Sequence, residues 1–563
     1  MVYVYTTLNE LNKYSKKELT VDEISHCLID MGMDLKGVSE DENPELKIEI
    51  TAEKFDMTSS IGISRAINSY LELQEPIIEI PITKGKEKVI VDKSVQEVRP
   101  KTVAAIVRNL ELDEEKLQMI IDIQEKIHES FGRHRKKAAI GVYPIDNITF
   151  PIHFRAKKPQ DISFQPLESK IEMRADKMIK NHPTCKKYAH LLQGANVYPI
   201  FTDNNDNILS LPPLINSHDT GRVEAHHRDV FIEVSGHNEH HLHNVLVTLV
   251  SAIQVMGGEI ESMQVEYVHE NNYVYELNLN PKVKVLTRDY ISSLVGVEFT
   301  NKEIIKLGKK MMYQVRELNK NELEFTIPCY KLDIFSACDI ADDIARAYGY
   351  NNIENVTPQI PMVGEEINFS RLRREIRQIC ANQGNLELYT YMLTSTQNQF
   401  SKMGKNVETQ KFIKIKDAAE EGINMMRTKL IPEILYSLHL NRKVKYPQKV
   451  FEVGMTIQRD KSQDTKARNQ WHLANVLAGP QISYTQIKEM ADSLFKLLGI
   501  YEEIEYKETT EKSFIEGRCA QILYKDRKLG LIGEIHPQIL HNFGLLVPVS
   551  AYELNLEFLR KLD

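Results

Sequence analysis

The spacing of apolar residues predicts helices and strands in alternation along the chain. Between residues 242 and 253, apolar side chains recur every three or four positions, which is typical of a helix with one buried face. Asn238 is a favourable N-cap, and Gly257 with Gly258 favours a stop. The pattern predicts a helix over this segment.

The N-terminal residues show both the helical and the strand periodicity. ELTVDEISHCLIDMGM and ISRAINSYLEL have the helical rhythm, whereas LKIEITAEKFD alternates as a strand does. We therefore expect an N-terminal α+β domain over residues 1–95. Residues 96–277 form the largest predicted module, with a strand at KKAAIGVYPI. The paired prolines of ILSLPPLIN exclude a central strand at that point.

A third unit is predicted over residues 278–355. Thr300 and Glu303 form a capping box that opens a helix over residues 301–315. The strand LEFTIPCY and an acidic helix follow. ENVTPQIPMVGEE has the prolines and glycine of a linker, and residues 356–563 form a fourth module.

Composition narrows the class of protein. A chain of 563 residues is too long to fold around one hydrophobic core, and this length favours three or four domains. The net charge of −8 argues against nucleic-acid binding over the whole surface, but allows a local basic patch. The six cysteines form no C-x-x-C pair, and no apolar run reaches the roughly 18 residues of a membrane span. We expect a cytoplasmic protein with buried thiols.

Histidines cluster in SGHNEHHLHN, residues 235–244. A zinc site needs at least three imidazoles that converge on one point. Here His240, His241 and His243 fall on the flanks and back of the predicted helix, and His237 precedes it. A solvated helix face is favoured over a zinc site, which stays the weaker alternative.

Aspartates cluster in DIFSACDIADDIARAYGYNN, residues 333–352. Asp339, Asp342 and Asp343 share one face of a first helical turn, and Asp333 lies in the preceding loop. Carboxylates in this arrangement suit Mg²⁺. Attraction to the helix dipole explains acids in a first turn equally well.

The aspartate-rich loop that leads into A-x-A-Y-G-Y-N-N-I resembles the phenylalanyl-tRNA synthetase beta subunit in its archaeal and eukaryotic form. Further stretches resemble this family in the same order along nearly the whole chain: IEITAEKFDMTSSIGISRAI, RPKTVAAIVRNL, IQEKIHESFGRHRKKAAIGV, HPTCKKYAHLL, NILSLPPLIN, RDVFIEVSG, MRTKLIPEILYSLHLNRKVKYPQKVFEVG, and EGRCAQI with GEIHPQILHNFGL.

This resemblance implies a multidomain α+β fold. It consists of the N-terminal α+β domain, an α/β editing domain (96–277), a small helical metal-binding module (278–355) and a C-terminal antiparallel-sheet domain like a class II synthetase core (356–563). The metal would be Mg²⁺ at Asp333, Asp339, Asp342 and Asp343. Asp342 stands where relatives more often have glutamate.

A class II active site needs an arginine that grips ATP and a glycine-rich motif that ends in arginine. KVFEVG, residues 449–454, resembles the surroundings of the first, but no G-x-G-x-x-x-R follows. The C-terminal domain therefore lacks the active-site motifs. The resemblance implies that ATP and the aminoacylation reaction belong to an alpha subunit, in an assembly of two alpha and two beta chains that binds tRNA-Phe.

An apolar pocket rejects a substrate with one extra hydroxyl only weakly, so a phenylalanine enzyme benefits from a site that hydrolyses Tyr-tRNA. The resemblance places this editing pocket at Phe201, Ser210, Asn216 and Ser235, where Ser and Asn hydrogen-bond a phenol and an ester. Relatives more often have threonine at Ser235. Ser210 and Asn216 are otherwise ordinary turn residues beside paired prolines.

Two segments depart from the family. VYPID places Pro144 where relatives have an acid, and SGHNEHH has more histidines than the matching segment of relatives. Both segments lie in the editing domain, so the level of editing activity stays open. For the basic cluster of residues 133–137 there are two interpretations: its side chains contact tRNA phosphates, or they form a solvated face. The alternative function is that of a stand-alone RNA-binding or regulatory relative without editing activity. A histidine-metal hydrolase is a weaker third idea.

Overall fold

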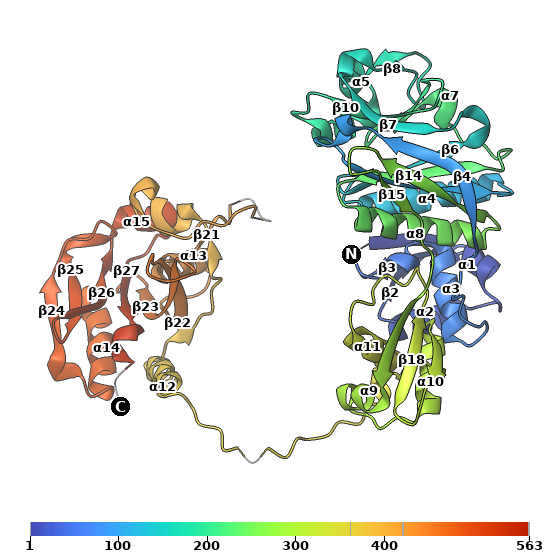
Figure 1. The fold of residues 1–563 in the computed structure, drawn as a ribbon. Coiled ribbons are helices and arrows are strands. Elements are labelled where there is room, and N and C mark those ends of the chain that lie inside the picture. Colours follow the sequence, from blue (N-terminus) through green and yellow to red (C-terminus); the bar gives the residue numbers. More distant parts are fainter. Residues whose placement is uncertain (1, 361, 419–421, 561–563) are drawn as a thin grey trace. The chain divides into compact units, whose positions relative to one another are not determined.

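The computed structural model describes residues 2–360, 362–418 and 422–560 (Figure 1). Two compact units make up the chain, Met1–Thr357 and Pro358–Asp563. The segment between them, which was predicted as a linker, has no helix or strand over residues 354–360 and 362–367.

The first unit begins with a three-stranded antiparallel sheet in the order β1-β3-β2. Its elements are β1 (Val2–Thr7), α1 (Leu8–Tyr14), α2 (Val21–Asp30), β2 (Asp34–Val38), β3 (Glu45–Ile50) and α3 (Ser60–Tyr70). Thr20 and Glu23 form a capping box that fixes the start of α2. The three helices bury apolar side chains against this sheet, as expected for an α+β domain.

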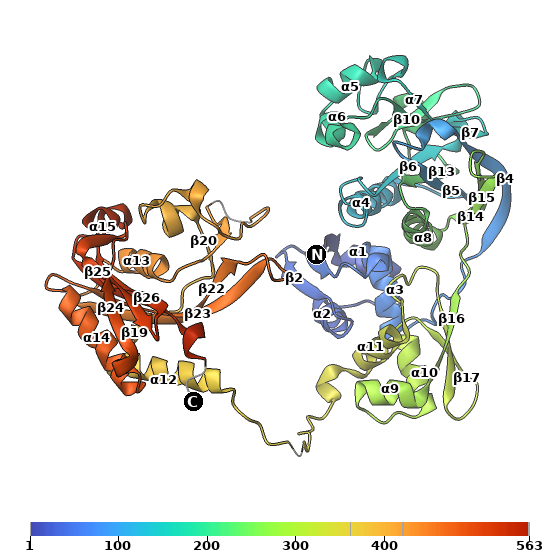
Figure 2. The ribbon, with the colours of Figure 1, turned by 60° about the vertical axis from the view of Figure 1, so that its left-hand side comes forward.

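A ten-stranded sheet follows, in the order β12-β11-β10-β7-β4-β14-β5-β13-β6, with β15 beside β14. Its strands are β4 (Ile82–Val91), β5 (Lys101–Arg108), β6 (Ala138–Pro144), β7 (Ile152–Lys157), β10 (Tyr198–Thr202), β11 (Ile208–Leu211), β12 (Ile215–Asn216), β13 (Val230–Gly236), β14 (Glu259–Tyr267) and β15 (Tyr273–Glu276). Five helices and a short strand pair accompany it: α4 (Glu114–Glu129), α5 (Ala175–Asn181), α6 (Pro183–Tyr188), α7 (His218–Gly221), α8 (Glu239–Val255), β8 (Ser163–Phe164) and β9 (Met173–Arg174). Helix α8 packs on β5 and β13, and α4 packs on β6 (Figure 2).

Two features of this sheet differ from the sequence predictions. The α/β class does not describe it, because only the β4–β14 and β4–β7 pairs are parallel and the rest are antiparallel. Strand β4 was assigned to the N-terminal domain, but it pairs with β14 and β7 in the large sheet. The predicted break at residue 95 therefore falls inside the larger part, because pairing between strand residues 176 to 178 positions apart cannot be read from local periodicity.

The third part has a three-stranded sheet in the order β16-β18-β17 and three helices. Its elements are β16 (Lys282–Thr287), α9 (Arg288–Val295), α10 (Asn301–Lys310), β17 (Gln314–Glu317), β18 (Glu322–Ile327) and α11 (Ala337–Tyr348). The Thr300–Glu303 capping box is confirmed, but the helix ends at Lys310. Met312 has a φ of 67°, which turns the chain into β17. The part predicted as helical is thus a mixed α+β fold.

The second unit is built on a seven-stranded sheet in the order β19-β22-β23-β27-β26-β25-β24, antiparallel except for β19–β22. Its strands are β19 (Leu386–Glu387), β22 (Gln448–Arg459), β23 (Ala467–Ala478), β24 (Ile504–Glu508), β25 (Phe514–Tyr524), β26 (Arg527–Ile535) and β27 (Val549–Asn555). Two short strands, β20 (Leu393–Thr394) and β21 (Met425–Met426), pair beside it. The helices are α12 (Asn368–Asn382), α13 (Ile431–Leu440), α14 (Tyr484–Leu497) and α15 (Pro537–Phe543).

Side chains that alternate along β23 supply both faces of this sheet with apolar contacts. Leu473 and Leu477 pack with α12 and α14, whereas Ala474 and Val476 pack with α13 and α15. Helices therefore cover both faces (Figure 1).

All six cysteines are free, and five are buried, whereas Cys338 is exposed. In the part of the chain that the structure describes, each helix is too short or too polar to span a bilayer.

Candidate functional site

A pocket of about 370 Å³ lies between α4, β6 and the segment that leads from β11 to α7. Apolar side chains of α4 and β6 make much of its wall, as in most small-molecule sites. Its polar lining includes Gln124, Glu125, His128, Arg135, Ser210, Asn216 and Glu233.

Three strands bring a row of hydrogen-bonding groups to this pocket. The Tyr143 hydroxyl on β6 donates to Ser210 Oγ on β11 at 2.7 Å, and lies 3.1 Å from Glu233 Oε1 on β13. Glu233 is 2% exposed, and its Oε2 has no hydrogen-bond partner among the described residues. An unpaired buried oxygen is unfavourable unless a ligand or water satisfies it.

Burial also controls the charge of Glu233. It raises the pKa of the carboxyl group to about 8, while Arg99, Tyr143 and Ser235 act in the opposite direction. At pH 7 the group is therefore mostly protonated, and it both donates and accepts hydrogen bonds. A carboxyl group with this shift in a pocket marks a functional candidate.

Two of the four predicted pocket residues line this cavity. Ser210 and Asn216 face each other across the β11–β12 pair. Phe201 lies outside the wall, stacked on Phe154 at 4.3 Å between ring centroids. Ser235 is also outside it, and its hydroxyl accepts a hydrogen bond from Arg99 Nε at 3.0 Å.

Glu233 was not among the predicted residues. The signal in the sequence is its position in VFIEVSG, a mainly apolar strand with no other charged residue. A glutamate is almost never fully buried unless it is paired or functional.

The basic cluster of residues 133–137 divides between surface and pocket. Arg133, His134, Lys136 and Lys137 are exposed. Arg135 instead turns inward, where its guanidinium donates to the carbonyl of Leu214 at 3.0 Å and to Glu125 at 2.8 Å. It therefore holds the pocket wall in place, and the remaining members are available to phosphates.

The histidines after Ser235 do not converge. Asn238 caps α8 as predicted, through a hydrogen bond from the backbone of His241. His241 stacks on Phe131, whereas His243 hydrogen-bonds the Tyr275 hydroxyl at 2.8 Å. These two rings are half-buried and structural, so the predicted solvated face describes only His237 and His240.

The four predicted magnesium ligands fall into separate environments. Asp339 caps its own helix by accepting hydrogen bonds from the backbone of Phe335 and Ser336. Asp342 accepts from Arg346 Nε at 2.8 Å. Asp333 and Asp343, by contrast, lie buried together.

Two lysines already occupy the space between Asp333 and Asp343. Lys331 Nζ lies 2.8 Å from Asp343 Oδ2, and Lys54 pairs with Asp333 and lies 3.6 Å from Asp343 Oδ1. Burial raises the pKa of Asp343, but the two lysines outweigh it and the pKa falls to about 2. Two ammonium groups balance the two carboxylates, so these residues do not fit a divalent cation. Among the described residues, no group of three or more His, Cys, Asp or Glu side chains could hold a metal ion.

In the second unit, the segment KVFEVG forms part of β22. Its Glu452 is fully buried and accepts a hydrogen bond from Arg427 at 2.7 Å, while Arg427 Nε donates to the Met455 carbonyl. The guanidinium group of Arg427 is thus held by hydrogen bonds to residues of its own unit.

Comparison with known proteins gives consistent matches. Residues 285–350 match the tRNA synthetase B5 domain, and residues 353–556 match the phenylalanyl tRNA synthetase beta chain CLM domain. The phenylalanine–tRNA ligase beta subunit of Thermococcus sibiricus is 34% identical over 97% of both chains, and that of Pyrococcus horikoshii is 36% identical over 90% of this chain and 89% of the relative.

A solved structure agrees with the first unit. The crystal structure of an N-terminal fragment of the phenylalanyl-tRNA synthetase beta subunit from Pyrococcus horikoshii has a TM-score of 0.59 and 32% identity, and it covers 62% of this chain and 100% of the fragment. Given this similarity over nearly its full length, the chain belongs to the phenylalanine–tRNA ligase beta subunit family.

Proposed function

We propose that this chain works in the cytoplasm with an alpha subunit, which binds ATP and attaches phenylalanine to tRNA-Phe, and that the pocket of the first unit hydrolyses Tyr-tRNA. The observation that carries the editing role is the buried Glu233, with one oxygen unpaired, in the same pocket as Ser210 and Asn216.

The pocket has the chemistry to select tyrosine. Tyrosine differs from phenylalanine by one hydroxyl, and a site built to hydrogen-bond a hydroxyl discriminates strongly against the analogue that lacks it. Glu233 offers such a partner, since its mostly neutral carboxyl group donates to or accepts from a phenol. The apolar wall from α4 accommodates the ring.

Hydrolysis adds water across the ester between the amino acid and the ribose. We assign the placement of that water to the Asn216 amide and the Ser210 hydroxyl, both of which donate and accept hydrogen bonds. The bond from the carbonyl carbon to the ribose oxygen breaks. Tyrosine leaves with the water oxygen, and the ribose oxygen takes the proton.

A dependence on an alpha chain is supported by exposed apolar side chains in the second unit. Leu386, Tyr389 and Tyr391 are 67%, 93% and 86% exposed within a short segment around β19. Exposed aromatic side chains that gather in one place are typical of protein interfaces. We propose an assembly of two alpha and two beta chains.

tRNA binding is supported by a groove of about 730 Å³ in the first unit. Lys126, Arg133 and Lys137 line it together with Tyr3 and Tyr5, which are partly exposed. Cations that contact phosphates, beside aromatic rings that stack on bases, are typical of single-stranded nucleic-acid binding.

The decisive experiment is co-expression with the cognate alpha chain, followed by aminoacylation and Tyr-tRNA hydrolysis assays. Asn216→Ala should slow hydrolysis at least about tenfold while charging with phenylalanine is retained. Asn181→Ala, at an exposed asparagine of α5 in the same part, is the matched control. Full hydrolysis by Asn216→Ala would overturn the editing site. Charging by the beta chain alone would overturn the division of labour.

A further inference from the structure

One face of the C-terminal sheet changes from apolar to polar along its strands. On β23, Ala474 and Val476 pack under α13, and His472 and Gln470 come next on the same face because side chains alternate. On β27, Ala551 is likewise followed by Glu553. The sheet therefore carries polar groups where the cover of α13 ends.

A pocket of about 390 Å³ lies at this polar end. Its apolar wall comes from α13, β25 and β26. Its polar lining consists of Gln399, Lys405, Lys429, Gln458, Gln470, His472, Glu511, Ser513, Lys528, Glu553 and Asn555. The volume and mixed lining match those of small-molecule sites.

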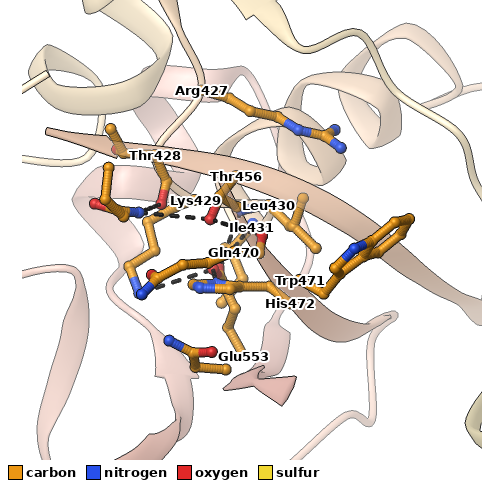
Figure 3. Close-up of polar contacts among 12 residues, drawn as sticks. Arg427, Thr428, Lys429, Leu430, Ile431, Thr456, Gln470, Trp471, His472 and Glu553 are labelled. Carbon is orange, nitrogen blue, oxygen red and sulfur yellow. Dashed lines mark hydrogen bonds and ion pairs between the residues drawn. The ribbon is translucent and has the colours of Figure 1, made fainter. Parts of the chain in front are cut away.

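Glu553 organises the floor of this pocket (Figure 3). Its Oε2 accepts the backbone N–H groups of Leu430 and Ile431 at 3.1 and 3.2 Å, and its Oε1 lies 2.7 Å from His472 Nδ1. Burial raises the pKa of Glu553, but Lys429 and His472 outweigh it and bring the pKa to about 2. The carboxylate is therefore ionised at neutral pH, and both of its oxygens are engaged.

The ionised carboxylate fixes the His472 ring. Because Glu553 accepts, the Nδ1 atom carries a proton, and Nε2 is the ring nitrogen left for a ligand. His472 is only 3% exposed, and its Nε2 has no hydrogen-bond partner in the described part of the chain. A buried ring nitrogen without a partner on a pocket wall calls for a hydrogen-bonding group from a ligand.

The rim of the pocket is cationic. Lys405 pairs with Glu511 at 3.2 Å. Lys429 lies 3.8 Å from Glu553, whose two oxygens already accept other hydrogen bonds. Lys528 on β26 is exposed at the same rim. Three ammonium groups thus face two carboxylates, which favours an anion.

We propose that this pocket binds a small molecule with one acidic group, one hydroxyl and an apolar body. The hydroxyl hydrogen-bonds His472 Nε2, and the carboxylate or phosphate lies between Lys429 and Lys528. The apolar body packs on Ile431, Phe514 and Leu529. This site is separate from the pocket of the first unit and does not depend on the editing proposal.

Calorimetric titration of the full chain with 4-hydroxybenzoate, 4-hydroxyphenyl phosphate and benzoate tests the proposal. The hydroxylated probes should bind at least about tenfold more tightly than benzoate, because benzoate leaves the buried Nε2 atom unpaired. The tighter of the two hydroxylated probes shows whether the acidic group is a carboxylate or a phosphate. No saturable binding of either one below about 10 mM would overturn the proposal.

Two variants locate the binding. His472→Asn keeps an amide donor for Glu553 but removes Nε2, so the preference for the hydroxyl should disappear while binding of benzoate is unchanged. Lys528→Ala should weaken all three probes, and it changes an exposed side chain that folding does not need. Lys507→Ala on β24, an exposed lysine outside the pocket, is the control. A hydroxyl preference that survives His472→Asn, or equal binding by Lys528→Ala and Lys507→Ala, would refute the assignment.

Discussion

Lys331 and Asp343 form a buried ion pair, with 2.8 Å between Nζ and Oδ2 and side-chain exposures of 1% and 3%. Together with the pair between Lys54 and Asp333, it joins the loop after β3 to the loop and helix after β18. Two of the four carboxylates that the sequence assigned to a divalent cation, Asp333 and Asp343, are thus neutralised by ammonium groups of the same chain.

Lys331→Met should destabilise the first unit by about 3–5 kcal/mol, because it leaves Asp343 buried with one cation fewer. Thermal unfolding followed by circular dichroism measures the effect. Lys306→Met, at a lysine with 64% side-chain exposure, is the matched control and should change the stability by less than about 0.5 kcal/mol. Equal melting curves for the two variants would show that the buried pair is dispensable.

Removal of divalent cations should leave the melting temperature of the beta chain unchanged, since Asp333 and Asp343 already have cationic partners. The measurement is thermal unfolding in EDTA and in millimolar Mg²⁺, with elemental analysis of the purified protein. A ligand that binds the folded state raises the melting temperature. A clear rise with Mg²⁺ would restore the magnesium site.

Glu233→Gln should change how stability depends on pH. The carboxyl group has an ordinary pKa of 4.5 when unfolded and about 8 when folded, so only the unfolded chain loses the proton between these values. Stability from this group is present below pH 4.5 and falls by up to about 1.4 kcal/mol per pH unit as the pH rises to 8. Glutamine does not titrate, so the stability of the variant rises relative to that of the wild type as the pH rises.

Urea unfolding of the full chain at intervals from pH 5 to pH 8 measures this difference. Glu97→Gln, at an exposed glutamate ahead of β5, should keep the wild-type slope. Parallel stability curves for Glu233→Gln and the wild type would contradict a protonated Glu233.

Arg133→Gln combined with Lys137→Gln should weaken tRNA binding and flatten its dependence on salt. Each phosphate contact that is lost lowers the slope of log K against log salt concentration by about 0.7 to 0.9. Filter binding at several salt concentrations gives the slope. Lys320→Gln, at an exposed lysine of the third part, serves as the control. If the double variant and the control have the same slope, the basic cluster is a solvated face that does not contact tRNA.

Tyr389→Ser and Tyr391→Ser should weaken association with the alpha chain, because an interface loses affinity when buried aromatic side chains are truncated. Gel filtration of the co-expressed pair measures the fraction assembled. Ile171→Ser, at a residue of the first unit with 63% exposure, controls for a general loss of surface apolar area. Unchanged assembly would place the interface elsewhere.

Local features of the fold could be predicted from the sequence. Asn238 caps α8 and the Thr300–Glu303 box opens α10, because such contacts join residues three positions apart. Ser210 and Asn216, which the family resemblance assigned to one pocket, line the same cavity because they face each other across a short strand pair. The family itself was evident from motifs in the same order along the chain.

The tertiary structure alone decided the charge and the partners of the functional groups. Lys54 reaches Asp333 across 279 residues of sequence, so helical spacing of the aspartates could not show that their charge is already neutralised. Glu233 and His472 likewise acquire their properties from burial and from neighbours on other strands. Hydrogen bonds within a turn are encoded locally, whereas desolvation and ion pairing depend on which distant side chains the folded chain brings together.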